Sequence, residues 1–537
     1  MPGSLTEAVL ARVRRGGPEV EMLLRAAVVV GSSFDLEVVA DLLGISVEDA
    51  AARAERALAS RLLVESGPAY EFANDLIHQV LYETTPRPTL VARHRRLAGM
   101  LAGRPEAVAG HAAAAGDWVG AAQAWRQAAM RAAAAFANRD AERLLGEAVA
   151  AAANSGEVAL QARARLDRGQ AREALGEYQE AFADHTEALR LAREAGDDPL
   201  ATEAVERLGW TAYFARDSQR GWEPAGRWRE LAERAAAAPG ARPSALLLVG
   251  RVRHAEGELE GAEAAFAAVL AAETDPATRA VAHQSLGLLL DHSDRFAEAR
   301  RLLDQAVEEG RRAGVLRSML TAQFGSALAC ANLGDFAGAL VRLERLARPL
   351  AEVEDATYHA RAATAASWVW RELGDLPRAR DLALRATELA GGSDAGSHPA
   401  LHAWLGLAEC ALVGGDEAEA GRLLQQAAGM LDLPLGYHWR ARLRHAELAA
   451  RLVPDEAEGL LATARVAGSA KYEALALARL GRHQEAARVA APVGSDYLLA
   501  EVAGGAAAGA ALDRLAAALP ADLRAGFLAR GRLASGR

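Results

Sequence analysis

The sequence predicts an almost entirely α-helical fold, in which antiparallel helix pairs stack into a superhelix behind a small domain of different character. Three observations lead to this prediction. Alanine, leucine and arginine dominate the 537 residues, of which 51% are hydrophobic and only 5% aromatic, a composition that favours closely packed helices. A turn motif recurs about every 40 residues along most of the chain. The first hundred residues do not follow that repeat.

The first hundred residues combine short helical patterns with two strand patterns. Helical patterns separated by turns are predicted at residues 5–15, 18–31, 39–43 and 46–60. Ser46 is placed to cap the last of these helices. A short strand is expected on either side of Gly67-Pro68, at residues 61–66 and 70–72. A helix–turn–helix followed by a hairpin is a winged-helix pattern, so residues 1–100 are predicted to form a winged-helix-like connector domain.

A repeat predicted to cover residues 105–490 gives the strongest signal in the sequence. Its mark is a glycine followed by an acidic residue, or a close variant, as in Gly334-Asp335. The acidic residues are spaced by 40, 41, 36, 41, 40 and 41, and they are Glu177, Asp217, Glu258, Asp294, Asp335, Asp375 and Asp416. Each turn is expected to join two helices, which bury their apolar faces only by stacking on the next pair. Residues 491–537 are predicted to form a C-terminal helical cap.

Small residues recur at fixed distances from these turns. A glycine lies eight residues before three of the acidic residues, and an alanine lies four residues after five of them: Gly169, Gly209, Gly250, Ala181, Ala262, Ala339, Ala379 and Ala420. This pattern resembles the tetratricopeptide repeat, with units slightly longer than the family's 34 residues. The resemblance implies a tetratricopeptide-like right-handed superhelix, with the first helix of each pair lining its concave groove.

Three segments of the first hundred residues resemble the region that follows the nucleotide-binding module of bacterial STAND-type ATPases and large ATP-dependent transcriptional regulators. They are residues 23–35, residues 72–82 and the basic run 93–98. Asn74 and His78 depart from the family's usual histidine and arginine. The resemblance implies a sensor and arm of such a regulator without its ATPase module.

Charge and motifs exclude several function classes. The net charge of −10 gives no general attraction to nucleic acid or membrane surfaces, and the acidic residues beside Arg53 and Arg56 argue against DNA contact by the winged-helix pattern. The only lysine, Lys471, follows alanine, so no phosphate-binding loop of the Gly-Lys-Ser/Thr type is present. Cys330 and Cys410 lie in no metal-binding pattern. No cofactor, metal or membrane segment is predicted, and the cytoplasm is the expected location.

Aromatic and basic residues on the first helices of three repeats are the candidate ligand-binding residues. Counted back from the turns, the groove-facing positions hold Trp210, Tyr213, Phe214, Arg251, His254, Trp368 and Arg371. An aromatic surface beside arginine suits a peptide, a sugar face or an anion. Packing between helix pairs is the competing interpretation for the tryptophans. His254 is expected to be a solvated groove residue rather than an acid–base catalyst.

The predicted function is non-catalytic binding of a protein, a peptide or a small effector. By analogy with the resembled regulators, the chain would serve as a regulatory or sensor arm, with an ATPase module as one expected partner. The alternative is a structural scaffold that holds an assembly together without an effector. An enzyme is not predicted, because no nucleophile–base pair or metal-ligand spacing is present.

Overall fold

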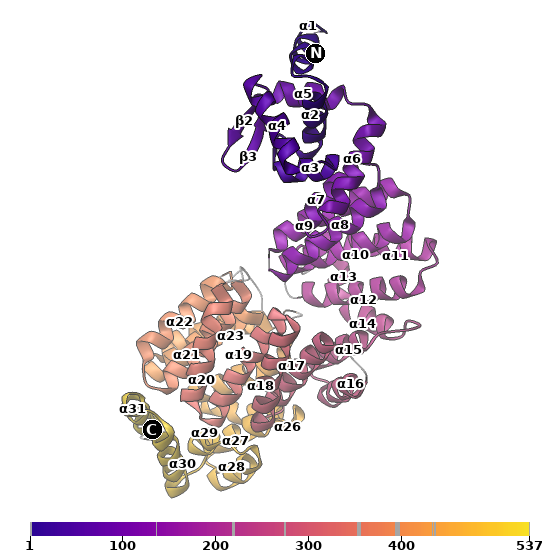
Figure 1. Cartoon of the computed structure of the whole chain (residues 1–537). Helices are drawn as coiled ribbons and strands as arrows, with labels where there is room; N and C mark the ends of the chain where they lie inside the picture. The colour runs from indigo at the N-terminus through magenta and orange to yellow at the C-terminus, as the bar shows by residue number, and fades with distance from the viewer. Residues whose placement is uncertain are drawn as a thin grey trace. The chain divides into compact units, whose positions relative to one another are not determined.

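The computed structural model describes residues 3–535, except for residues 136, 217–220, 273–274, 352–355, 392–397, 432 and 434–435. Within this part of the chain there are 31 α-helices, two 3₁₀ helices and three short strands (Figure 1). The chain divides into two compact units, residues 1–201 and residues 202–537. The prediction of an all-α superhelix of antiparallel helix pairs is confirmed.

Unit 1 begins with helices that surround a three-stranded antiparallel sheet of order β1-β3-β2. The predicted hairpin is present, with Leu63 opposite Phe72 and Ser66 opposite Ala69. A third strand, which the sequence did not predict, forms where a turn was expected. The elements are α1 (Gly3–Arg15), α2 (Pro18–Val30), β1 (Ser33–Phe34), α3 (Leu36–Leu43), α4 (Val47–Ala59), β2 (Leu63–Ser66), β3 (Ala69–Phe72), α5 (Asp75–Glu83) and α6 (Arg87–Met100).

Side-chain caps fix where these short helices begin. Asp35 accepts a hydrogen bond from the Glu37 amide, and Asn74 accepts one from the Ile77 amide. Ser46 accepts a hydrogen bond from the Asp49 amide, so its predicted capping role is confirmed. Each cap satisfies an amide that the first helical turn would leave without a partner.

Antiparallel helix pairs complete unit 1. They are α7 (Pro105–Ala114), α8 (Trp118–Ala134), α9 (Asn138–Ser155), α10 (Val158–Leu175), α11 (Tyr178–Glu194) and the start of α12 (Asp198–Ala215). Alanines fill the space between successive helices, including Ala121, Ala148 and Ala164, which are fully buried. Small side chains allow this close packing because they keep neighbouring backbones near each other.

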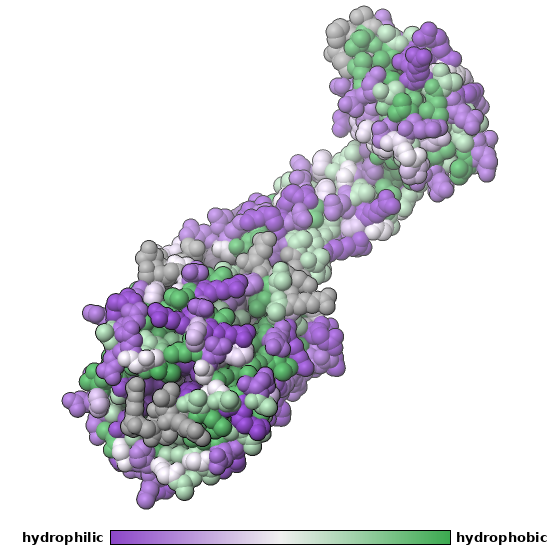
Figure 2. All heavy atoms as spheres, turned by 90° about the vertical axis from the view of Figure 1, so that its left-hand side faces the viewer, coloured by the Kyte–Doolittle hydropathy of each residue, from purple (hydrophilic) through white to green (hydrophobic). Residues whose placement is uncertain are grey.

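Unit 2 contains the remaining helix pairs. Its elements after α12 are α13 (Glu223–Gly226), α14 (Trp228–Ala236), α15 (Pro243–Glu256), α16 (Leu259–Ala271), α17 (Pro276–His292), α18 (Phe296–Ala313), α19 (Leu316–Leu333), α20 (Phe336–Ala351), α21 (Ala356–Glu372), α22 (Leu376–Leu389), α23 (His398–Gly414), α24 (Glu417–Leu431), α25 (His438–Leu452), η2 (Pro454–Glu456), α26 (Ala457–Val466), α27 (Ala470–Arg479), α28 (His483–Ala490), η3 (Ala491–Val493), α29 (Asp496–Val502), α30 (Gly505–Ala518) and α31 (Ala521–Ser535). Hydrophilic side chains cover much of the visible face in Figure 2, interspersed with apolar patches.

The repeated turns share one backbone arrangement. The amide of the residue after the left-handed position donates to the carbonyl five residues earlier, as Asp335 does to Cys330 and Asp375 does to Trp370. The glycine before it takes the left-handed conformation, with φ 90° at Gly334, as expected at a helix C-terminus. In the repeat without this glycine, Asp294 takes the conformation itself, with φ 60°. Asp217 lies outside the described residues.

The glycine eight residues before the turn lets the two helices of a pair approach closely. A methyl group at Gly250 would lie 2.5 Å from a ring carbon of Phe266, which is fully buried. Gly250→Ala is therefore expected to lower the free energy of unfolding by about 1–3 kcal/mol, measured by urea denaturation. Gly429→Ala is the matched control, because its methyl would meet open space, and it should stabilise α24 by about 0.5–1 kcal/mol. Equal effects of the two substitutions would contradict this account of the pair.

Helices far apart in the sequence lie together in unit 2, where later repeats pack against earlier ones. α25 lies beside α15, and α29 lies beside α19; the yellow C-terminal helices in Figure 1 lie next to helices of the earlier repeats. The Tyr437 amide donates to the Ala255 carbonyl over 2.7 Å, and the Ser495 hydroxyl donates to the Asn332 carbonyl. We call this surface the seam. It runs between the C-terminal ends of α15, α17 and α19 and the N-terminal ends of α25, α27 and α29.

Candidate functional site

The first predicted cluster is assembled, and it is buried. Trp210 stacks on Phe214 with ring centroids 5.5 Å apart, and the Tyr213 ring lies 6.0 Å from Trp210. Arg251 lies 5.5 Å from the centre of the Trp210 ring and donates to Ser285 and Gln284. Trp210 and Tyr213 are 7% and 5% exposed. The geometry of these aromatic rings is that of packing between helices.

His254 differs from its expectation as a solvated residue, because it is 2% exposed. The seam covers it. The Tyr437 ring packs edge-on against His254 at 4.9 Å, and His254 Nε2 lies 2.9 Å from His292 Nδ1. His398 also packs on Tyr437, and His402 Nε2 lies 3.1 Å from His398 Nε2. We call Tyr437 and these four histidines the histidine cluster.

Burial keeps three histidines of the cluster, His254, His292 and His402, neutral at physiological pH. Burial, together with the positive charges of Arg251 and Arg440, lowers the pKa of His254 to about 3. Burial and the neighbouring histidines also lower the pKa values of His292 and His402 well below their usual range. A neutral imidazole in an apolar setting cannot exchange protons readily near pH 7.

Unit 2 is expected to lose stability in mild acid. A histidine whose pKa is lower in the folded chain contributes its full stability above the unfolded value of 6.5. That stability is lost as the pH falls from 6.5 towards 3, by about 1.4 kcal/mol per pH unit for each histidine. Burial raises the pKa of Asp291 to about 6, which offsets part of this loss below pH 6.

Urea denaturation between pH 7.5 and pH 5.0 measures this slope. A His254→Phe/His292→Phe variant should show a shallower decline than the wild-type chain, because two of the lowered pKa values are removed. Identical slopes in the two proteins would assign the acid sensitivity to other groups.

A second polar cluster crosses the seam around Asp294. One carboxylate oxygen accepts from both terminal nitrogens of Arg440 at 3.3 Å. The other accepts from the Ser469 hydroxyl at 2.7 Å and the Lys471 amide at 3.0 Å. Lys471 also donates from Nζ to Asn332 over 2.7 Å, and burial lowers its pKa to about 8. This set of contacts joins α17 and α19 to α25 and α27.

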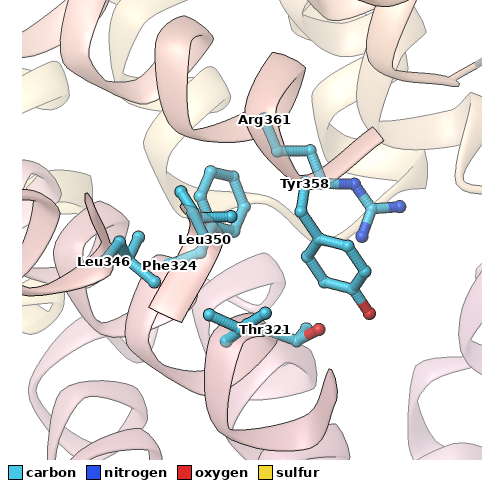
Figure 3. Close-up of a pocket in the computed structure, with 7 residues that line it drawn as sticks. Thr321, Phe324, Leu346, Leu350, Tyr358 and Arg361 are labelled. Atoms are coloured by element: carbon cyan, nitrogen blue, oxygen red, sulfur yellow. The ribbon is translucent and has the colours of Figure 1, made fainter. Parts of the chain in front are cut away.

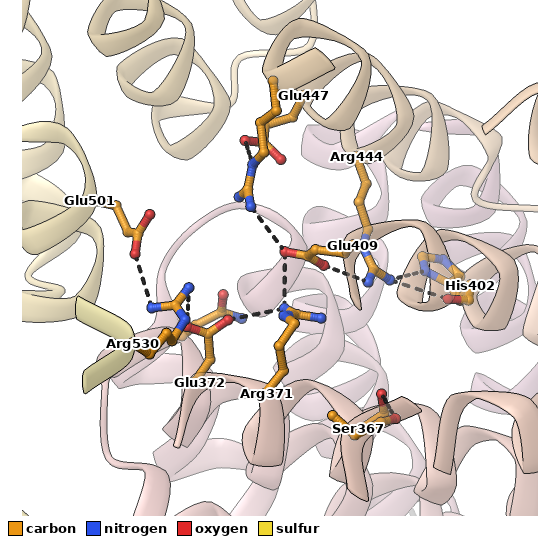
Figure 4. A network of polar contacts seen from close by, with 12 residues as sticks. Ser367, Arg371, Glu372, His402, Glu409, Arg444, Glu447, Glu501 and Arg530 are labelled. Carbon is orange, nitrogen blue, oxygen red and sulfur yellow. Dashed lines mark hydrogen bonds and ion pairs between the residues drawn. The ribbon is translucent and has the colours of Figure 1, made fainter. Parts of the chain in front are cut away.

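The third cluster, which we call the arginine–glutamate network, lies where the inner helices of the later repeats meet (Figure 4). Its members come from α21, α23, α25, α27, α29 and α31, and they are Arg371, Glu372, Glu409, Arg444, Glu447, Arg451, Arg479, Glu501 and Arg530.

Arg371 and Glu409 are at the middle of this network. Arg371 is 1% exposed. Its Nη2 lies 2.9 Å from Glu409 and 3.0 Å from Glu372. Glu409 also contacts Arg444 at 3.1 Å and Arg451 at 3.6 Å. Burial alone would raise the pKa of Glu409, but the guanidinium groups around it lower that pKa well below its usual range.

Two hydrogen-bond donors of the Arg371 guanidinium have no acceptor in the described part of the chain. Its Nε and Nη1 atoms are buried and have no hydrogen-bond partner among the described residues. A buried donor without an acceptor costs about 1–3 kcal/mol, and more when the group is charged. The arrangement can therefore hold a hydrogen-bond acceptor, and a carboxylate is the strongest such partner for a guanidinium.

A small pocket lies between α19, α20 and α21 (Figure 3), and the predicted residue Trp368 is not among its lining residues. Its walls are mostly apolar. The polar groups among the residues labelled in Figure 3 are the Thr321 hydroxyl, the Tyr358 hydroxyl and the Arg361 guanidinium. The lining residues are Leu320, Thr321, Phe324, Leu346, Leu350, Tyr358 and Arg361. Trp368 itself lies at the seam, 5.5 Å from the Lys471 ammonium group.

The sequence interpretation missed residues that carry much of the interior chemistry. A polar residue lies three positions before the turn in three successive repeats, at Asp291, Asn332 and Glu372, and this pattern could have indicated an inward polar row. Tyr437 and Lys471 have no comparable signal, because their position depends on how later repeats return to earlier ones.

Two classes of site are not found in the described part of the chain. No helix there is long and apolar enough to cross a membrane. No group of three or more histidine, cysteine, aspartate or glutamate side chains there could hold a metal ion.

Comparisons of the sequence with protein-family models and with curated proteins find no match. Similar solved structures include a STAND protein with a tetratricopeptide-repeat sensor from Pyrococcus horikoshii, at 13% identity over 76% of this chain, with a TM-score of 0.48. This chain spans 62% of that protein's chain.

A Rap protein complexed with competence and sporulation factor matches at 12% identity over 67% of this chain and 100% of its own, with a TM-score of 0.48. NprR in complex with its cognate peptide NprX matches at 14% identity over 62% of this chain and 97% of its own, with a TM-score of 0.45. At identities this low, the similarity is one of fold and does not extend to the side chains of a binding site.

Proposed function

We propose that the chain is a non-catalytic recognition module whose inner helices in unit 2 bind an acidic group of a peptide, a protein segment or a small effector. The observation that carries this proposal is Arg371, a fully buried arginine with two donors that no described residue satisfies. These two donors, Nε and Nη1, lie on either side of Nη2, which already contacts Glu409 and Glu372, so each can donate separately to an oxygen of an acidic group.

The charged side chains in the interior of unit 2 favour a function in ligand binding over a purely structural one. Ion pairs that are removed from water stabilise a fold less than apolar side chains of similar volume, because desolvation offsets most of their attraction. The inner helices nevertheless carry Glu409 with three guanidinium groups around it. We infer that these charges serve recognition, as buried polar groups of ligand sites do.

The order of elements at the start of the chain supports the regulatory part of the proposal. Helices α3 and α4 followed by the β2–β3 hairpin have the order of a winged helix, and we propose that they connect the repeats to an ATPase module of a STAND-type signalling or transcriptional regulator in the cytoplasm. DNA is not the proposed partner, since Arg56 is paired with Glu19 at 2.6 Å.

A structural scaffold is the second candidate function. The burial of Trp210 and Tyr213 favours it, because these residues then serve packing between repeats. In that case the aromatic cluster would bind nothing, and its loss would affect stability alone.

Selection from a displayed random-peptide library against the full chain tests the proposal. Enriched peptides should carry an acidic residue, and their dissociation constants should rise about tenfold or more with Arg371→Lys, which keeps the charge and removes the Nε and Nη1 donors. Arg422→Lys, on an exposed arginine, is the matched control and should leave binding unchanged. A Trp210→Ala/Arg251→Ala variant tests the first predicted cluster in the same assay. Peptides without an acidic residue that bind the Arg371→Lys chain equally would favour the scaffold.

A further inference from the structure

The C-terminal helix α31 is seated on the turn between α21 and α22 by very close backbone contact. A methyl group at Gly374 would collide with the backbone of Gly526, and one at Gly526 would collide with the Leu373 carbonyl. Only glycine on both sides allows this approach. Beside it, the Phe527 ring is 1% exposed and lies 5.9 Å from the Phe336 ring.

Arg530 is the polar anchor of the same helix. Its Nη2 lies 2.5 Å from Glu372, and its Nη1 lies 3.3 Å from Glu501. Figure 4 shows this guanidinium reaching from α31 into the arginine–glutamate network. Glu372 is fully buried and Glu501 lies on α29, so the site presents two carboxylates to whichever cation enters it.

Leu523 and Leu528, both partly buried, add to the apolar contact of α31 with the cluster that contains Phe336. Between residues 521 and 530, Phe527 is the one buried residue, and most of the others are exposed. Gly526, Phe527 and Arg530 lie on one face of the helix, because positions three and four apart are neighbours. A helix in which half of residues 521–530 are exposed, and which is held by one buried aromatic ring, two partly buried leucines and one charge, belongs to the less stable part of a fold.

We propose that the surface under α31 is a docking site for a helix of a partner protein, and that α31 occupies it as a displaceable internal substitute. The partner helix presents a glycine, an aromatic side chain directly after it and, three residues later, an arginine, as Gly526, Phe527 and Arg530 do. This is the helix-in-groove mode of recognition. The partner's arginine is required because Glu372 and Glu501 would otherwise lose their Arg530 partner in a buried setting.

This inference rests on the proposed function, since the displaced helix uncovers the network that contains Arg371. It adds a second event, in which a basic aromatic helix replaces α31 before or while an acidic ligand binds.

Fluorescence anisotropy with a labelled peptide of residues 521–535 tests the docking site on the full chain. The peptide should bind a Phe527→Ala/Arg530→Ala chain at least tenfold more tightly than the wild-type chain, whose own α31 competes. A peptide carrying Arg530→Ala should bind the variant chain at least tenfold more weakly than the native peptide. Equal binding of the native peptide to both chains, or none to a variant chain that melts as a folded protein, would overturn the proposal.

Hydrogen exchange on the wild-type chain gives a second measurement that does not depend on the variant. Amides of α31 should exchange faster when the unlabelled peptide is in excess, while those of α21 keep their protection. Unchanged exchange in α31 at saturating peptide would also overturn the proposal. If displayed acidic peptides still depend on Arg371 in that case, the docking site fails alone and the recognition function stands.

Discussion

Glu409→Gln is expected to lower the free energy of unfolding by about 3–5 kcal/mol, the usual cost of removing one partner from a buried ion pair. Arg371, Arg444 and Arg451 all contact this carboxylate, and Arg371 is almost completely buried. The substitution keeps the shape of the side chain and removes its charge. Three guanidinium groups would then lose their shared counter-charge, and the buried Arg371 would keep only Glu372 as a carboxylate partner.

Urea denaturation followed by circular dichroism measures this effect. Glu417→Gln, on an exposed residue of the next helix α24, is the control and should change stability by less than about 0.5 kcal/mol. The pH dependence gives an independent check. Because the folded pKa of Glu409 is lowered, its contribution is present above the unfolded value near 4.5 and is lost only as the pH falls further towards the folded pKa. A loss below about 1 kcal/mol would show that the network is hydrated and worth no more than a surface pair.

Asp294→Ala should produce a second large loss, about 3–5 kcal/mol, because it leaves Arg440 buried without its carboxylate. It also removes the acceptor for the Ser469 hydroxyl and the Lys471 amide. Most of this loss in the free energy of unfolding should come from the contacts across the seam, and less from the local turn. Tryptophan fluorescence provides a readout beside the site, since Trp439 donates from its indole to the His254 carbonyl at 3.2 Å.

Two substitutions separate the seam from the turn. Asp335→Ala removes the acidic residue of the next turn, which follows the left-handed Gly334 and whose carboxylate accepts from the Gly338 amide and so caps its helix. It should cost only about 1 kcal/mol, the usual value of such a cap. Asp294→Asn retains a residue that tolerates the left-handed backbone and should cost less than the alanine variant. If Asp294→Ala and Asp335→Ala are equally destabilising, the contacts of Asp294 across the seam contribute no more than a single helix cap.

The turns of the repeat could be predicted because they depend on local chemistry. Gly334-Asp335 ends one helix and starts the next through bonds that span five residues or fewer. Gly250 could likewise be assigned a packing role, since its neighbour Phe266 follows sixteen positions later in the same pair. Such short-range patterns are repeated in the sequence and reinforce one another.

The interior site could be predicted only in part. Arg371 and Arg251 were chosen as inward residues, and both contact other inner helices, at Glu409 and Ser285, but their burial was not foreseen. The missing information is the rise and rotation per repeat. The rise and rotation accumulate over several repeats and bring Ser469 into contact with Asp294, which lies 175 residues earlier in the sequence. No local sequence pattern encodes these two quantities. His254 was expected to be solvated for the same reason, because Tyr437 covers it from a later repeat.

The seam has consequences for how unit 2 should unfold and for how it should fold during synthesis. In an open solenoid each repeat touches only its neighbours, and stability accumulates along one dimension. Here, the loss of a single repeat also removes contacts to a repeat much earlier in the sequence, so unfolding should be all-or-none rather than a fraying from one end. During synthesis, the ends of α15, α17 and α19 stay exposed until the residues from Tyr437 onward have left the ribosome. The polar groups at the ends of α15, α17 and α19 are therefore buried only after the second half of unit 2 has been synthesised.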